Sequence, residues 1–166
     1  LADVLHHAVE TVQPRIADLR ALSAEYERVK AALRKLQSDP ADADAHLAVG
    51  TFYALHKGQW TVGLPHLARG SDKELAALAQ KEIAHPAEGS EQVAIGDAWW
   101  NLGEHHPGPA KAIMQRHAAD WYRTAKNSIE GLTLTRINAR LADEGNAPPP
   151  APPGPGAKPL AEPDPH

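Results

Sequence analysis

The stretch LAVGTFY (residues 47–53) returns in altered form as VAIGDAWW (residues 93–100). In each copy apolar residues precede a glycine, Gly50 or Gly96, and aromatic residues follow within four positions. A helical unit that recurs at a period of roughly 20–50 residues is typical of stacked helix pairs. The duplication therefore predicts an all-α fold of helical hairpins. Such a stack more often provides a binding surface than a catalytic site.

Composition narrows the classes of function. The chain has 166 residues, a formal net charge of −4 and no cysteine. This charge disfavours generic binding to nucleic acid or to an anionic membrane. No apolar run approaches the roughly 18 residues of a membrane-spanning helix. The lack of cysteine excludes disulfides, thiolate metal sites and cysteine nucleophiles. Because the first residue is Leu1 rather than Met, we interpret the chain as a processed product or part of a longer protein.

Apolar periodicity outlines the helices along the whole chain. Pro14 interrupts the first pattern, which leaves one kinked helix or two before Ser38. Ser71–Glu74 reads as a capping box, and Ser90 and Thr133 are candidate caps for later helices. The predicted helices cover residues 1–12, 16–37, 43–56, 60–69, 71–83, 90–103, 110–127 and 133–145.

The C-terminal segment differs from the rest. Nine of the 19 residues from Pro148 to the end are proline, which predicts a disordered or polyproline II tail. A tether is the favoured role, and a ligand for a proline-reading domain is the alternative. The chain is thus divided into an N-terminal helical segment (1–40), a helical repeat domain (41–145) and a Pro-rich tail (146–166).

The first copy resembles a tetratricopeptide repeat. That family places a Leu-Gly pair and an aromatic residue in its first helix and small residues in its second. Val49-Gly50, Tyr53, Gly58 and Trp60 lie at corresponding places, and Ile95-Gly96 begins a second copy. The resemblance implies that the glycines allow close helix packing. The helix at 71–83 is an insertion between the two units, so the array is irregular.

Residues 25–143 also resemble a helical module of large, uncharacterised bacterial proteins, notably planctomycete ones. The resemblance is carried by words such as YERVKAAL (26–33), KGQW (57–60) and GDAWW (96–100). It implies a bacterial accessory module, often attached to exported domains. It provides no catalytic residues, and the sequence leaves the compartment open.

Ten histidines raise the question of a metal site. His6-His7 lie next to each other on a helix, so their rings point about 100° apart and do not share an ion easily. His105-His106 lie in a predicted loop, and His117 lies in a helix. Metal sites need three or four converging ligands, so we expect these histidines to be solvated or hydrogen-bonded. We predict no metal site, no other cofactor and no catalytic site.

The predicted function is a scaffold that binds another protein. The inner faces of the first helices of each pair would line a shallow groove, with Thr51, Ala54, Asp97, Trp100 and Asn101 as the candidate binding residues. One of Trp99 and Trp100 is expected at a rim or beneath the neighbouring helix, because adjacent residues on a helix cannot both point inward. The alternative is a domain that binds a small ligand or glycan through an exposed tryptophan. We expect neither nucleic acid nor a membrane as a partner, and the sequence leaves the protein partner and the oligomeric state open.

Overall fold

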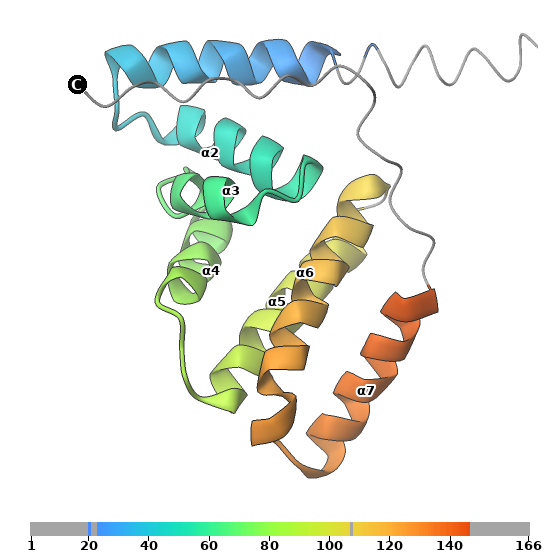
Figure 1. Ribbon diagram of the computed structural model, residues 1–166. Helices are drawn as coiled ribbons and strands as arrows, with labels where there is room; N and C mark the ends of the chain where they lie inside the picture. Colours follow the sequence, from blue (N-terminus) through green and yellow to red (C-terminus); the bar gives the residue numbers. More distant parts are fainter. Residues whose placement is uncertain (1–19, 21–22, 107, 147–166) are drawn as a thin grey trace, which may run out of the picture.

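The computed structural model describes residues 20, 23–106 and 108–146, and every regular element among them is helical (Figure 1). This confirms the prediction of an all-α fold. The predicted helix at 1–12 and the Pro-rich segment from residue 147 lie outside the described residues. After a helix at 23–38 come α2 (Ala43–Thr51), a π-helical turn η1 (Phe52–His56), α3 (Trp60–Leu67), α4 (Lys73–Ile83), α5 (Gly89–His105), α6 (Pro109–Ala125), a 3₁₀ turn η2 (Lys126–Ser128) and α7 (Gly131–Asn146).

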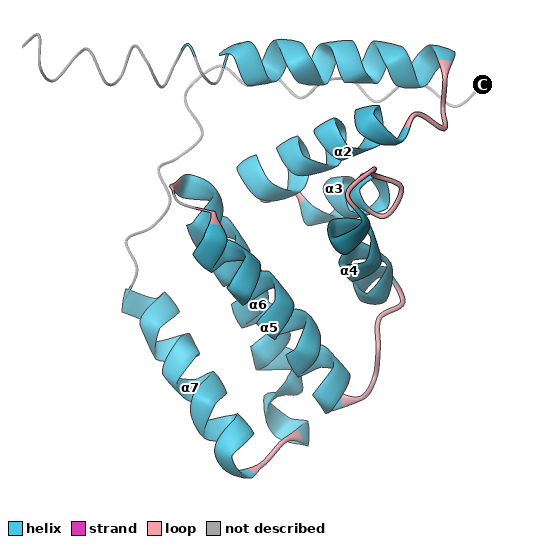
Figure 2. Cartoon of the chain, turned by 180° about the vertical axis from the view of Figure 1, so that it is seen from behind, coloured by secondary structure: helices cyan, strands magenta, loops and turns pink. Residues whose placement is uncertain are grey.

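The helices form an elongated stack (Figures 1 and 2). Helix 23–38 and α2 lie at one end, and α5, α6 and α7 lie side by side at the other. Between these ends, α3 packs against both α2 and α4, and η1 contacts α6. Among the elements from α2 to α7, the two most extensive contacts are α5 with α6 and α2 with α3, which are the two hairpins that contain the duplicated stretch.

The main core runs through the α5–α6 hairpin into α3, α4 and α7. Its largest completely enclosed side chains are Trp99, Tyr122, Leu67 and Met114. Burying one large apolar side chain stabilises a fold by about 1.5–3 kcal/mol. A smaller cluster of Ala32, Ala45 and Val49, with leucines around it, joins helix 23–38 to α2.

Glycine allows the close helix contacts in both hairpins. A Cβ added at Gly50 would lie 2.7 Å from the backbone nitrogen of Leu67 on α3, and one added at Gly96 would lie 2.6 Å from the Tyr122 ring. These distances confirm the close approach predicted for the two glycines. Gly63 on α3 also allows close packing in the first hairpin, because a Cβ added there would lie 2.6 Å from the backbone nitrogen of Ala54.

Three predicted helix starts are wrong by one or two residues. Asp72, rather than Ser71, caps α4, and its Oδ1 accepts from the backbone nitrogens of Glu74 and Leu75 at 3.0 Å each. An Asp carboxylate stabilises a helix N-terminus by both capping and charge. Two of the three long helices at the C-terminal end begin at glycines before the predicted caps, α5 at Gly89 and α7 at Gly131.

A pair of histidines joins α2 to α3. The Nδ1 atoms of His46 and His66 lie 2.8 Å apart, and Nε2 of His46 lies 3.0 Å from the carbonyl oxygen of Pro40. Since that carbonyl can only accept, Nε2 of His46 donates to it and Nδ1 of His46 accepts from His66. Burial, followed by the nearby His46 and Arg69, lowers the pKa of His66 below its usual value.

The lowered pKa of His66 predicts that stability falls in mild acid. The folded state holds the His66 proton less tightly than the unfolded chain does, so the stabilisation is complete above the unfolded pKa of about 6.5 and declines below it. We therefore expect the melting temperature to drop between pH 8 and pH 5, and the drop to shrink in His66→Gln. The exposed His56→Gln is the control. An equal drop in His66→Gln and the parent would contradict this interpretation.

Candidate functional site

The predicted binding residues fall into two separate parts of the fold. Asp97, Trp100 and Asn101 lie on α5, whereas Thr51 ends α2 and Ala54 lies in η1. The prediction that Ala54 lines an open surface is wrong, because the residue is completely buried and its backbone packs against Gly63. Thr51 is half-buried and Asn101 is exposed. The candidate site is therefore built on α5 and its neighbours.

Asp97 is an ion-pair centre rather than an open groove residue. It accepts hydrogen bonds from the Tyr122 hydroxyl at 2.8 Å, from Arg136 at 2.6 Å and from Arg140. Burial alone would raise the pKa of the Asp97 carboxyl, but the hydrogen bonds from Arg136 and Tyr122 and the two arginine charges outweigh it and lower the pKa. Burial and the same carboxylate raise the pKa of Tyr122. The cluster ties α7 to the α5–α6 hairpin.

Trp100 lies next to this cluster and only partly inside the fold. The Arg140 guanidinium lies 5.2 Å from the Trp100 ring centroid, so one arginine contacts both Asp97 and Trp100. Trp99, its neighbour, is completely buried. The two adjacent tryptophans thus differ in burial, as expected for residues that cannot both point inward.

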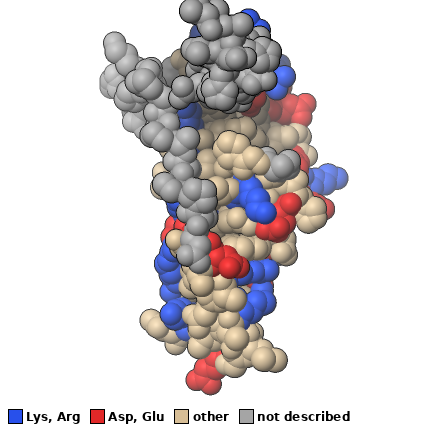
Figure 3. All heavy atoms as spheres, turned by 90° about the vertical axis from the view of Figure 1, so that its right-hand side faces the viewer, with Lys and Arg blue, Asp and Glu red and all other residues tan. Residues whose placement is uncertain are grey.

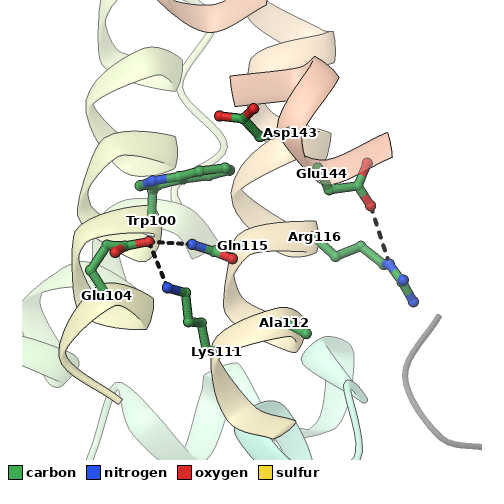
Figure 4. Close-up of a pocket in the computed structure, with 8 residues that line it drawn as sticks. All are labelled: Trp100, Glu104, Lys111, Ala112, Gln115, Arg116, Asp143 and Glu144. Carbon is green, nitrogen blue, oxygen red and sulfur yellow. Dashed lines mark hydrogen bonds and ion pairs between the residues drawn. The ribbon is translucent and has the colours of Figure 1, made fainter. Parts of the chain in front are cut away.

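A shallow hollow of about 190 Å³ opens beside Trp100, between α5, α6 and α7 (Figure 4). On the α5 side, Glu104 accepts from Gln115 and lies 3.1 Å from the Lys111 ammonium. On the α7 side, Glu144 pairs with Arg116 at 3.4 Å and with Arg123 at 2.7 Å. The charged groups around the hollow are thus largely paired with one another.

The histidines considered above as metal ligands make other contacts in the fold. Among the described residues, no group of three or more His, Asp and Glu side chains is placed to hold an ion. His105 and His106 each hydrogen-bond to a backbone carbonyl oxygen one turn earlier, at 2.7 and 2.9 Å. His6 and His7 lie outside the described residues.

His117 is paired with a carboxylate that the sequence did not single out. Its Nε2 lies 2.6 Å from Oε1 of Glu82, and Nε1 of Trp99 donates to Oε2 of the same carboxylate at 2.6 Å. The Trp60 ring stacks on His117 with a centroid distance of 3.6 Å. One feature of the sequence could have indicated this role. Glu82 follows Ala79 by three positions, so both residues lie on the same face of α4, and that face is otherwise apolar and buried.

The face on the α7 side carries charges of both signs. In Figure 3, Lys and Arg side chains are interspersed with Asp and Glu side chains among uncharged atoms. No helix in the described part of the chain has the length and apolar character needed to cross a membrane. Comparisons with known protein families, curated proteins and solved structures find no match to this chain.

Proposed function

We propose that this chain is a non-catalytic interaction module that binds another protein through the face of α5, α6 and α7 around Trp100. The observation that carries the proposal is a half-buried tryptophan beside a shallow hollow, with an arginine against its ring. Tryptophan and arginine are the residues most enriched at energetically dominant positions of protein interfaces. The two hairpins, each with its packing glycine, support a tetratricopeptide-like stack as the scaffold of this face.

The size of the hollow favours a protein over a small ligand at this face. Sites for small molecules usually measure about 300–1,000 Å³ and enclose most of the ligand. The hollow beside Trp100 measures about 190 Å³. It suits one or two side chains of a partner better than a sugar chain. Mixed charges around it would pair with a partner of mixed charge.

Site-specific photocrosslinking tests the proposal. A photoreactive amino acid at exposed Asn101, one residue from Trp100, is expected to capture a protein from a lysate of the source organism. The same group at exposed Thr61 on α3 is expected to capture none. Equal capture from both positions would contradict the assignment of the face.

Truncation of Trp100 tests how much this side chain contributes to the affinity for the captured protein. Loss of a central tryptophan contact costs about 2 kcal/mol or more, so Trp100→Ala should weaken binding of the captured protein by at least tenfold. Val62→Ala, which truncates an exposed side chain on α3, should leave affinity unchanged. Affinities would be measured by calorimetry on variants whose circular dichroism matches the parent. If Val62→Ala weakens binding and Trp100→Ala does not, the partner docks elsewhere.

A further inference from the structure

A second and larger hollow lies on another part of the molecule, next to the buried Glu82–His117 pair. It measures about 520 Å³ and is bounded by the end of α4, the segment 84–88, the first turn of α5 and α6. Glu82 and His117, both at least nine-tenths buried, form part of its lining, together with the exposed Asp120 and His85 and the half-buried Trp121. Its volume is within the range of small-ligand sites.

The buried Glu82 carboxylate presents acceptors to this hollow. Each Glu82 oxygen accepts one hydrogen bond, whereas a carboxylate has about four lone-pair positions. Glu82 therefore keeps unused acceptor positions at the hollow that it lines.

The lining favours a cation. It contains the carboxylates of Glu82 and Asp120, and no lysine or arginine lines it. Arg123, which pairs with Asp120 at 2.7 Å, lies outside the lining. Trp121 adds an aromatic wall of the kind that packs on an alkyl chain or a cation. No three of the His, Asp and Glu residues are placed for a metal ion, which leaves an organic cation as the best match.

His85 at the edge of the hollow has an unusual backbone conformation. It follows the C-terminal cap of α4 and has a φ of 47°, a left-handed conformation that glycine adopts at this position in many helices. A residue with a side chain is strained there. His85 also belongs to the lining of the hollow.

We propose that this hollow binds a primary ammonium group, which belongs either to a free alkylamine or to a lysine side chain. The ammonium donors match the carboxylate oxygens of Glu82 and Asp120, and Trp121 packs against the alkyl chain. The site is separate from the Trp100 face and does not depend on the function proposed for it.

The four tryptophans make the test direct, because each indole N–H gives its own signal in a nitrogen–proton NMR spectrum. Titration with n-butylammonium at pH 8 is expected to shift the signals of Trp121 and of Trp99, which donates to Glu82, in a saturable manner. The signal of Trp100 should stay in place. Equal saturable shifts with the neutral isostere n-butanol, or binding of propionate in place of the cation, would overturn the proposal.

Two variants keep the proposal falsifiable without disturbing the buried pair. His85→Gly is expected to raise the melting temperature by a few degrees, because glycine relieves the strain, and to weaken n-butylammonium binding at least fivefold. Trp121→Leu should weaken binding by a similar factor with the fold retained. If both variants bind n-butylammonium as the parent does, the site is not where we place it.

The same titration distinguishes the two sources of the ammonium group. Tenfold tighter binding of a short lysine peptide than of 1,5-diaminopentane would assign the site to a lysine side chain of a protein. The reverse order would assign it to a free amine. Failure of every amine to shift the Trp121 and Trp99 signals would exclude both sources.

Discussion

Gly50→Leu is expected to lower the free energy of unfolding by about 3 kcal/mol, near the upper end for overpacking a core. Even a Cβ at this position would lie 2.7 Å from the backbone nitrogen of Leu67 and 2.8 Å from its side chain. A backbone atom cannot rotate away, so α2 and α3 must separate. In a domain of this size the melting temperature should fall by roughly 10 °C.

Gly96→Leu should have an effect of similar size for a related reason. Its Cβ would meet the Tyr122 ring at 2.6 Å and the backbone oxygen of Ala118 at 3.2 Å. The ring cannot swing aside, because Tyr122 is completely buried and its hydroxyl is held by Asp97. The two variants therefore probe the same packing device in the two hairpins.

A glycine in open space is the matched control. Gly145 lies in α7, and a Cβ added there would meet nothing within 4 Å. Gly145→Leu should therefore leave stability within about 0.5 kcal/mol of the parent, as most surface substitutions do. Thermal unfolding followed by circular dichroism measures the melting temperatures of the three leucine variants. If the Gly50 and Gly96 variants melt with the parent, the close-packing account is wrong.

The sequence was most informative where structure depends on local pattern. Helical periodicity located each described helix to within a few residues, because an amphipathic helix repeats its apolar face every 3.6 residues. The duplicated glycine stretch also identified the two hairpins. Its glycines are needed because the helices contact each other directly at these positions, and the sequence shows this requirement as a glycine at the same place in both copies. The error at the start of α4 has a local cause, since the neighbouring polar residues Ser71 and Asp72 compete for the same cap.

The candidate site was harder to predict, because it depends on residues far apart in the chain. Asp97 was expected to line a groove, yet Arg136 and Arg140 on α7 enclose it from about 40 positions away. Ala54 was expected at the surface, yet the small side chain lets α3 cover it at Gly63. Neither environment follows from the apolar periodicity. Periodicity indicates which face of a helix is apolar, but not which other element packs against that face.

Glu82→Ala is expected to lower the free energy of unfolding by about 3 kcal/mol, a typical loss when one partner of a buried ionic or hydrogen-bonded pair is removed. The substitution leaves two buried donors, Nε1 of Trp99 and Nε2 of His117, without the acceptor that each contacts at 2.6 Å. It also enlarges the hollow that Glu82 lines at the end of α4. Denaturant unfolding followed by tryptophan fluorescence measures the loss.

Variants of the same pair separate the hydrogen bonds from the cavity. Glu82→Gln keeps the volume and one acceptor oxygen, so it should lose less stability than Glu82→Ala. In a double-mutant cycle, Glu82→Ala combined with His117→Ala should cost about 1–2 kcal/mol less than the sum of the single variants, because the orphaned donor on His117 is gone. The exposed Glu74→Ala on the same helix should cost no more than about 1 kcal/mol. Strict additivity in the cycle would show that the carboxylate and the imidazole do not stabilise each other, and that Glu82 acts through Trp99 alone.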